Sequence, residues 1–402
     1  MAYRLVSDRA NAIMSIRSSQ LVNAFFNSYR ANRASGNTEA DFTFGNPHDM
    51  PLPGVVEAFR TWIEPRDKDW FAYKTSEQKS REVAAVSLER LLSMPFEPDD
   101  IAMTNGGFGA IAVALKLVAN PGDEVIFSLP PWFSYEPICV EAGLTPVKVS
   151  INTETFDLDL DAIESAITPR TRVLIVNTPQ NPTGKVLTAE TLTRLASLLE
   201  DASERNGQRI YLLSDEPYNR IVFDGFTHRS PLEFYPYAFM AYSYGKTLLM
   251  PGQRMGYLAM PPTMPREDRE QLREAIYNLQ LFCGYLFPNA LLQHAIGDLE
   301  GMTLDVAYQQ RKRDHVVDAL VEMGYEVQRP EGTFYVFPKS PIADDAEFTR
   351  LLAAEGVLVL PGEVFETPGF FRICLTANDA MIERGLPGFA RIISKLNRAD
   401  RF

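Results

Sequence analysis

The sequence contains few of the residues that build disulfide frameworks or zinc sites. It has only 3 cysteines and 4 histidines among 402 residues. The cysteines (Cys139, Cys283 and Cys374) are scattered and odd in number, which argues against a disulfide framework and favours a reducing compartment. We therefore expect a cytoplasmic protein. Because no cysteine lies in a cluster with histidines, we also expect no metal site.

Basic residues and long apolar runs are scarce as well. The 39 Lys and Arg residues are outnumbered by 52 Asp and Glu residues, which gives a formal net charge of -13. Nucleic-acid binding needs a basic surface, so we expect no nucleic-acid partner. No apolar run approaches the roughly 20 residues that span a bilayer, and the N-terminus has no unbroken apolar core of a signal peptide. We expect no membrane association.

The middle of the chain alternates short apolar, β-branched runs with helix-length amphipathic runs. This alternation predicts an α/β fold with a mostly parallel sheet that helices cover on both faces. The runs with strand character are 124–130, 145–151, 172–179, 209–217, 240–244 and 254–260, and those with helical character are 109–119, 135–143, 158–167 and 189–207.

Length and pattern also predict how the chain divides. We expect a large domain over 46–290 and a smaller α+β domain over 291–402, with the helical segment 1–45 packing on the smaller domain. Within these ranges the pattern predicts a long helix over 265–300, a helix near 305–322, a hairpin around 334–338, a helix at 346–355, a strand at 370–375 and a terminal helix.

Polar residues stand just after several of the predicted strands. Taken alone, each has an ordinary explanation: the segment 181–184 is a turn sequence, Asp215 can cap a helix, and Lys246 or Arg254 can be solvated. Together they form a pattern, because the carboxyl ends of parallel strands meet at one edge of the sheet. We expect an acid, a lysine and an arginine to converge there.

Two nucleotide-binding motifs are incomplete. Gly245-Lys246-Thr247 is similar to the end of a P-loop, but Met240 stands where that motif needs glycine. The glycine cluster 106–109 lacks the spacing of the dinucleotide fingerprint. These glycines open a helix instead, and the N–H groups at its N-terminus suit one phosphate group.

In order and spacing, these residues resemble a known family over nearly the whole chain. The resemblance is to the pyridoxal-phosphate (PLP) enzymes of fold type I, and specifically to class I and II aminotransferases related to aspartate aminotransferase. It is carried by Asn181, Asp215, Tyr218, Ser243, Lys246, Arg254 and Arg372. It implies the PLP transferase fold, with a large seven-stranded-type sheet domain and a small domain built from both termini. It also implies PLP as cofactor, transfer of an amino group from an L-amino acid to a 2-oxo acid, and a homodimer with shared active sites.

The resemblance assigns roles at the cofactor. Lys246 would hold PLP as a Schiff base and then move a proton, and Asp215 would keep the pyridine nitrogen protonated. Asn181 and Tyr218 would hydrogen-bond the ring oxygen. The remaining contacts would come from the phosphate-binding residues Ser243, Arg254, Gly106, Gly107 and Phe108, from Trp132 stacked on the ring, and from Tyr73 reaching the partner subunit's phosphate.

The resemblance also assigns a substrate site. Arg372, inside an apolar strand, would grip the α-carboxylate bidentately, with Asn181 and the backbone of Gly45 beside it. The segment 282–287 is aromatic and has no arginine for a second carboxylate. We therefore expect apolar or aromatic donors, in a pocket bordered by Trp132, Tyr285 and Phe287. Arg17 is the alternative source of a second charge.

Other activities remain open on the same residues. C–S β-lyase, amino-acid oxidase, cyclase and racemase chemistry all use the lysine and the aspartate as transamination does. A transcriptional regulator built on this fold would carry an N-terminal winged-helix module. The segment before Gly45 is too short for one, and the acidic balance argues against it as well.

Overall fold

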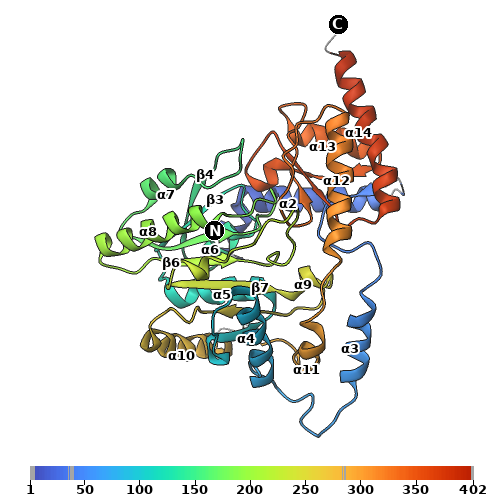
Figure 1. The fold of residues 1–402 in the computed structure, drawn as a ribbon. Helices are drawn as coiled ribbons and strands as arrows, with labels where there is room; N and C mark the ends of the chain where they lie inside the picture. Colours follow the sequence, from blue (N-terminus) through green and yellow to red (C-terminus); the bar gives the residue numbers. More distant parts are fainter. Residues whose placement is uncertain (1–4, 35, 37–39, 283, 285–286, 400–402) are drawn as a thin grey trace.

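A seven-stranded sheet forms the centre of the molecule (Figure 1). The computed structural model describes residues 5–34, 36, 40–282, 284 and 287–399. All neighbouring strands of the sheet are parallel, except that β8 runs antiparallel to both β2 and β7. The predicted mostly parallel sheet is confirmed. In spatial order its strands are β2 (Ile101–Thr104), β8 (Gly256–Ala259), β7 (Ala238–Ser243), β6 (Tyr211–Asp215), β5 (Thr171–Asn177), β3 (Glu124–Leu129) and β4 (Thr145–Ser150).

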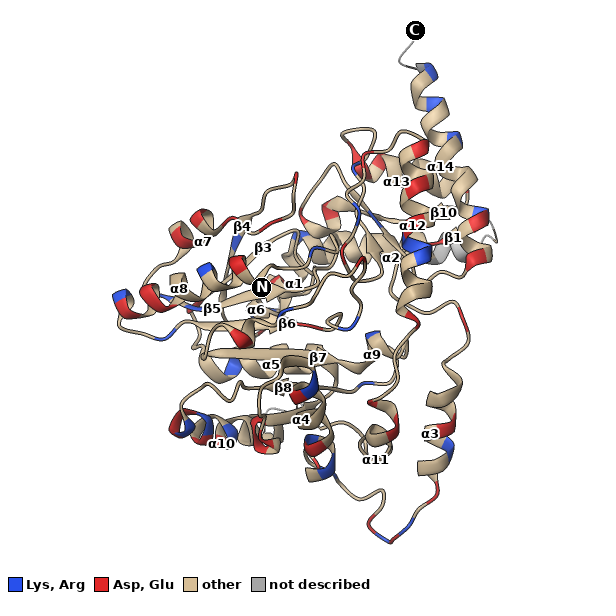
Figure 2. Cartoon of the chain, viewed as in Figure 1, with Lys and Arg blue, Asp and Glu red and all other residues tan. Residues whose placement is uncertain are grey.

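Helices cover both faces of this sheet because successive side chains along each strand point to opposite faces. On β6, Leu212 packs in the core layer beneath α8, and Leu213 packs in the layer beneath α5. The helices around the sheet are α3 (Pro53–Ile63), α4 (Gln78–Leu92), α5 (Gly106–Val118), α6 (Tyr135–Glu141), α7 (Leu160–Ala166), α8 (Ala189–Asn206), α10 (Arg266–Phe282) and α11 (Ala290–Leu299). Figure 2 shows that charged residues lie mostly on the helices, whereas β7 and β8 carry almost none.

The C-terminal part is a smaller α+β unit. An antiparallel sheet in the order β11-β12-β9 lies at its centre, and the N-terminal strand β1 pairs in parallel with β10. Both ends of the chain therefore build this unit, as predicted. Its elements are β1 (Ala40–Asp41), β9 (Tyr335–Val336), β10 (Val357–Leu358), β11 (Leu360–Pro361), β12 (Phe371–Cys374), α12 (Val306–Glu322), α13 (Asp345–Ala354) and α14 (Asp379–Ala399).

Two N-terminal helices run across the molecule. Helix α1 (Asp8–Ser15) packs against α6, and α2 (Arg17–Ala34) packs against the 3-10 helix η3 (Gly362–Phe365). In Figure 1, α2 lies between the helices of the C-terminal unit and the central sheet. The N-terminal segment thus contacts both parts of the molecule, and among the described helices none is long and apolar enough to cross a membrane.

Two local predictions were wrong. The long helix predicted over 265–300 is divided into α10 and α11, because Pro288 lacks an N–H group and Asn289 caps α11 by accepting from the Leu292 N–H. The hairpin predicted around 334–338 does not form: β9 pairs instead with β12, far along the chain. A short apolar run indicates that a strand forms, but it does not indicate which other strand it pairs with.

Candidate active site

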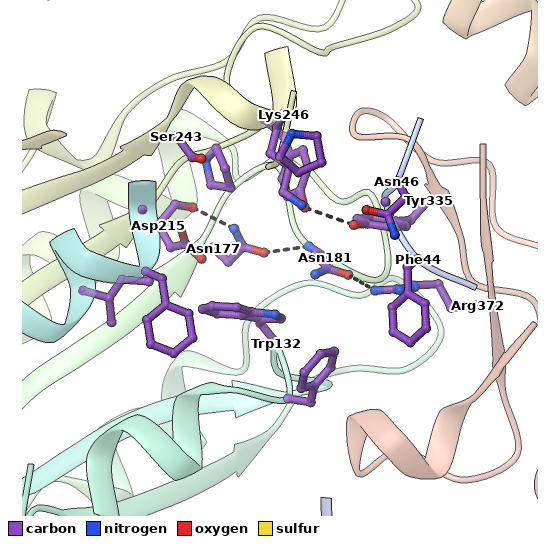
Figure 3. Close-up of a pocket in the computed structure, with 18 of the residues that line it drawn as sticks. Phe44, Asn46, Trp132, Asn177, Asn181, Asp215, Ser243, Lys246, Tyr335 and Arg372 are labelled. Atoms are coloured by element: carbon purple, nitrogen blue, oxygen red, sulfur yellow. Dashed lines mark hydrogen bonds between the residues drawn. The ribbon is translucent and has the colours of Figure 1, made fainter. Parts of the chain in front are cut away.

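A cavity of about 340 Å³ lies where the strands of the large sheet end and the C-terminal unit begins (Figure 3). Its volume is in the range of small-molecule sites. Of the residues that the resemblance assigns to the cofactor and to the substrate carboxylate, it brings together all but Gly106 and Tyr73. Those that line it are Gly45, Gly107, Phe108, Trp132, Asn181, Asp215, Tyr218, Ser243, Lys246, Arg254 and Arg372.

Lys246 lies on the one-turn helix α9 (Tyr244–Thr247), directly after β7. Two hydroxyl contacts hold this turn in place: the Tyr242 hydroxyl lies 2.9 Å from Thr247 Oγ1, and the Tyr244 hydroxyl donates to Glu300. Burial lowers the pKa of Lys246 to about 8. Within the described ranges, Lys246 Nζ has no hydrogen bond or ion pair. It is a nucleophilic amine facing a cavity.

Asp215 ends β6 and is 6% exposed. Burial raises its pKa to about 7, although the Tyr135 hydroxyl, which donates a 2.6 Å hydrogen bond to Oδ2, and the charge of Lys246 favour the ionised form. The Asn177 side chain donates to the Asp215 backbone oxygen at 2.7 Å and so holds the end of the strand. Asp215 is therefore a carboxyl group fixed at the floor of the cavity.

The first turn of α5 and Arg254 lie close together at the cavity. Gly106 has φ +80°, and a Cβ placed on it would lie 2.8 Å from Arg254 Nη2. Arg254 donates 2.9 Å to the Pro251 oxygen, which directs the guanidinium toward the helix N-terminus. Ser243 adds a hydroxyl at the end of β7. N–H groups, a hydroxyl and a guanidinium at one helix end are the groups that bind phosphate.

Arg372 lies on β12 and is 2% exposed. It donates 2.9 Å to Asn181 Oδ1 and 2.8 Å to the Thr43 oxygen, but its Nε has no partner in the described part of the chain. No ion pair to a carboxylate is found for it among those residues. A buried guanidinium without an anion is costly, so this geometry suits an anionic ligand that enters the cavity.

Gly45 lines the same cavity as this arginine and lies beside the lysine. A Cβ at position 45 would lie 3.0 Å from the Tyr335 hydroxyl and 3.5 Å from Lys246 Nζ. A side chain here would crowd the Tyr335 hydroxyl and narrow the cavity beside the amine.

The sequence did not single out several groups that lie here. Tyr135 contacts Asp215, and Tyr335 places its hydroxyl 3.2 Å from that of Tyr218 and its ring 4.2 Å from the Arg372 guanidinium. Burial raises the pKa of Tyr218 and Tyr335, so both keep their protons. Phe26 and Phe44, from the N-terminal segment, also line the cavity. Only a long-range contact map would have indicated them.

Three aromatic or charged residues named from the sequence do not line this chain's cavity. Tyr73 is fully exposed, and the Phe287 ring packs 6.2 Å from Tyr277. Arg17 pairs with Glu363 and is not a lining residue. Tyr285 lies outside the described residues. The assignment of Tyr73 to the partner subunit stays a prediction.

Comparison with known proteins agrees with this geometry. The family model "Aminotransferase class I and II" matches residues 38–388. The aspartate/prephenate aminotransferase of Thermus thermophilus is 30% identical over 357 residues, covering 88% of this chain and 90% of the relative. The aspartate aminotransferase of Thermotoga maritima is 30% identical over 371 residues, covering 90% and 92%.

Solved structures of the same kind superpose on the whole chain. An amino transferase from Eubacterium rectale has a TM-score of 0.89 at 29% identity and covers 98% of this chain and 99% of that chain. The aspartate aminotransferase from Thermus thermophilus with maleate has a TM-score of 0.84 at 27% identity and covers 97% and 100%. The chain is therefore a member of the class I and II aminotransferase family, a PLP-dependent enzyme of fold type I that moves the amino group of an L-amino acid to a 2-oxo acid.

Proposed function

We propose that transamination takes place in this cavity, with Lys246 as the Schiff-base lysine and Arg372 as the ligand of the substrate α-carboxylate. One observation carries the proposal: a partly buried amine and a buried guanidinium face the same cavity, and within the described ranges neither has a carboxylate partner. An amino acid bound at Arg372 would present its Cα to Lys246, as amino-group transfer requires.

The lining residues fit PLP. The α5 N-terminus, Ser243 and Arg254 offer a phosphate site at one end of the cavity, and Asp215 offers a carboxyl group for the pyridine nitrogen at the floor. Trp132 would cover the ring face, and Asn181 and Tyr218 would meet the ring oxygen. When bound, PLP supplies a reactive aldehyde and an electron-withdrawing ring.

Each of the chain's lining residues then has its own role in the reaction. Arg372 and Asn181 fix the carboxylate, so that the Cα–H bond is held in one orientation. Lys246, with its pKa lowered to about 8, is partly unprotonated near neutral pH and can take the proton from Cα. Asp215, in its ionised form, would stabilise positive charge on the pyridine nitrogen of bound PLP. The aromatic side chains around them exclude water.

We further propose a cytoplasmic homodimer with shared sites. Tyr73 is fully exposed in the single chain, and Phe71, Tyr277 and Phe282 are exposed by 54%, 45% and 78%. Large apolar side chains on a surface favour contact with another copy. The two described cysteines, Cys139 and Cys374, are buried free thiols, which supports a reducing compartment.

Borohydride reduction of the purified enzyme tests the central assignment. We expect peptide mapping to find the pyridoxyl label on Lys246, and Lys246→Ala to remain folded without turnover. A label on another lysine would overturn the assignment. Product analysis separates transamination from the lyase, oxidase and cyclase alternatives, because only transamination converts the cofactor stoichiometrically to pyridoxamine phosphate and the donor to its 2-oxo acid.

A further inference from the structure

The cavity has two aromatic walls, and of their rings the proposed function assigns only Trp132 a place against the cofactor. Phe26 of α2 and Phe44, just after β1, stack with their ring centroids 4.8 Å apart and an interplanar angle of 5°. On the other wall, Trp132 lies 5.4 Å from Phe108, edge to face, and 6.3 Å from Phe133. All five rings line the same cavity.

We propose that these walls select a large apolar or aromatic substrate side chain, and that Phe26 is a specificity-determining residue. The inference rests on the proposed transamination function, because it takes Arg372 as the carboxylate anchor. Figure 3 places Phe44 next to Arg372, with Trp132 on the side of the cavity opposite Lys246. A substrate whose carboxylate is held at Arg372 and whose Cα faces Lys246 has its side chain between these rings.

The charges of the cavity favour the same substrate class. Its cationic lining residues among those described are Lys246, Arg254 and Arg372, and the proposed function already gives each of them a partner. The alternative, Arg17, is paired with Glu363 outside the lining. A second substrate carboxylate would therefore find no unassigned cationic partner among these lining residues, and its desolvation beside the aromatic rings would be poorly compensated. The names of the similar proteins include aspartate, but this cavity is a poor fit for the aspartate side chain.

The wall formed by Phe26 is held in place at both ends of its helix. At the start of α2, Arg17 forms its ion pair with Glu363, and toward the other end the Tyr29 hydroxyl donates a 2.6 Å hydrogen bond to Asp41 Oδ2. Between them, Phe25 packs against the apolar cluster that includes Val364 and Phe365, and its ring meets the Phe44 ring edge on, with the ring centroids 5.9 Å apart. The ion pair of Arg17 and the hydrogen bond of Tyr29 orient Phe26 toward the cavity.

A donor panel with L-phenylalanine, L-alanine and L-aspartate tests the inference on the wild-type holoenzyme. We expect kcat/KM for phenylalanine to exceed that for aspartate at least tenfold, since a pocket distinguishes apolar side chains by about 10- to 200-fold for small differences in fit. We expect Phe26→Ala to lower the phenylalanine-to-alanine ratio of kcat/KM about tenfold, and Phe26→Leu to lower it less.

Phe25→Ala is the matched control, because Phe25 is the adjacent residue of the same helix and contacts Phe44 but does not line the cavity. A general loosening of α2 would affect both variants, whereas loss of a substrate contact affects only Phe26. An unchanged ratio in Phe26→Ala, an equal drop in Phe25→Ala, or aspartate as the best donor overturns the inference while transamination stands. Failure of every donor would instead overturn the proposed function.

Discussion

The Tyr135 hydroxyl donates a 2.6 Å hydrogen bond to Oδ2 of Asp215, and both side chains are buried. Tyr135 begins α6 and Asp215 ends β6, so the bond joins two sequence segments that meet only at the carboxyl edge of the sheet. Burial favours the protonated carboxyl group, and this bond favours the ionised one. The charge of Asp215 near neutral pH therefore depends on Tyr135.

Replacing Tyr135 with Phe should raise the pKa of Asp215 further. A hydrogen bond to a charged group is worth about 1.5–3 kcal/mol, which corresponds to about one or two pH units. We expect the acid limb of the kcat/KM profile to move upward by about one unit, with activity partly recovered at high pH. Tyr325→Phe is the control, because its hydroxyl donates to the Phe389 backbone, away from the cavity. Equal acid limbs in the two variants would contradict this role.

Asp215 should also destabilise the cofactor-free protein. Burial raises its pKa from 3.8 to about 7. Below about pH 3.8 the carboxyl group is protonated in both the folded and the unfolded state and does not destabilise the fold. As the pH rises through 7, the buried group ionises and that stability is lost. The ionised form then costs about 4 kcal/mol. We expect apo Asp215→Asn to have a higher Tm than the wild-type apoprotein at pH 8 and a smaller advantage at pH 5. A difference that does not grow with pH would refute the argument.

Much of the site could be predicted because its reactive residues stand at or just after the ends of strands. Asp215 comes at the end of β6, and Lys246 comes just after β7, so the topology of a parallel sheet alone brings them to one edge. Phe26 and Tyr335 could not be placed in this way. They reach the cavity through α2 and through the pairing of β9 with β12, and such long-range contacts have no local sequence signal.

The lowered pKa of Lys246 should be visible in the pH dependence of the rate at which the apoprotein binds PLP. Only the unprotonated amine attacks the aldehyde, and burial lowers the pKa of Lys246 from 10.5 to about 8. We expect the rate of borohydride-trappable labelling to rise about tenfold per pH unit from pH 6 and to level off above about 8. A rate that still increases at pH 10 would indicate an ordinary, solvated lysine.

Hybrid dimers test whether Tyr73 acts across subunits. Lys246→Ala and Tyr73→Ala should each be impaired as homodimers. A mixed dimer contains one site with native Lys246 and the partner subunit's native Tyr73, so co-refolding should restore about a quarter of wild-type activity. Mixing Lys246→Ala with Arg372→Ala is the control, because both residues line the cavity of one chain and no intact site can form. No gain with Tyr73→Ala would mean that Tyr73 does not complete the partner's site.

Replacing Arg372 should lower kcat/KM for every amino donor by a similar factor, whereas replacing Phe26 should change the preference among donors. Its guanidinium is held by Asn181 and the Thr43 oxygen and rests 4.2 Å over the Tyr335 ring, which leaves donors free for a carboxylate in one fixed plane. Lysine in its place keeps the charge but cannot form the bidentate contact. A charge-assisted bond of about 1.5–3 kcal/mol corresponds to a loss of about 10- to 150-fold in kcat/KM. We expect Arg372→Lys to lower kcat/KM within this range for phenylalanine, alanine and aspartate, with an unchanged ratio between phenylalanine and alanine. If the loss falls on one donor alone, Arg372 recognises a side chain, and the carboxylate anchor must be sought elsewhere in the cavity.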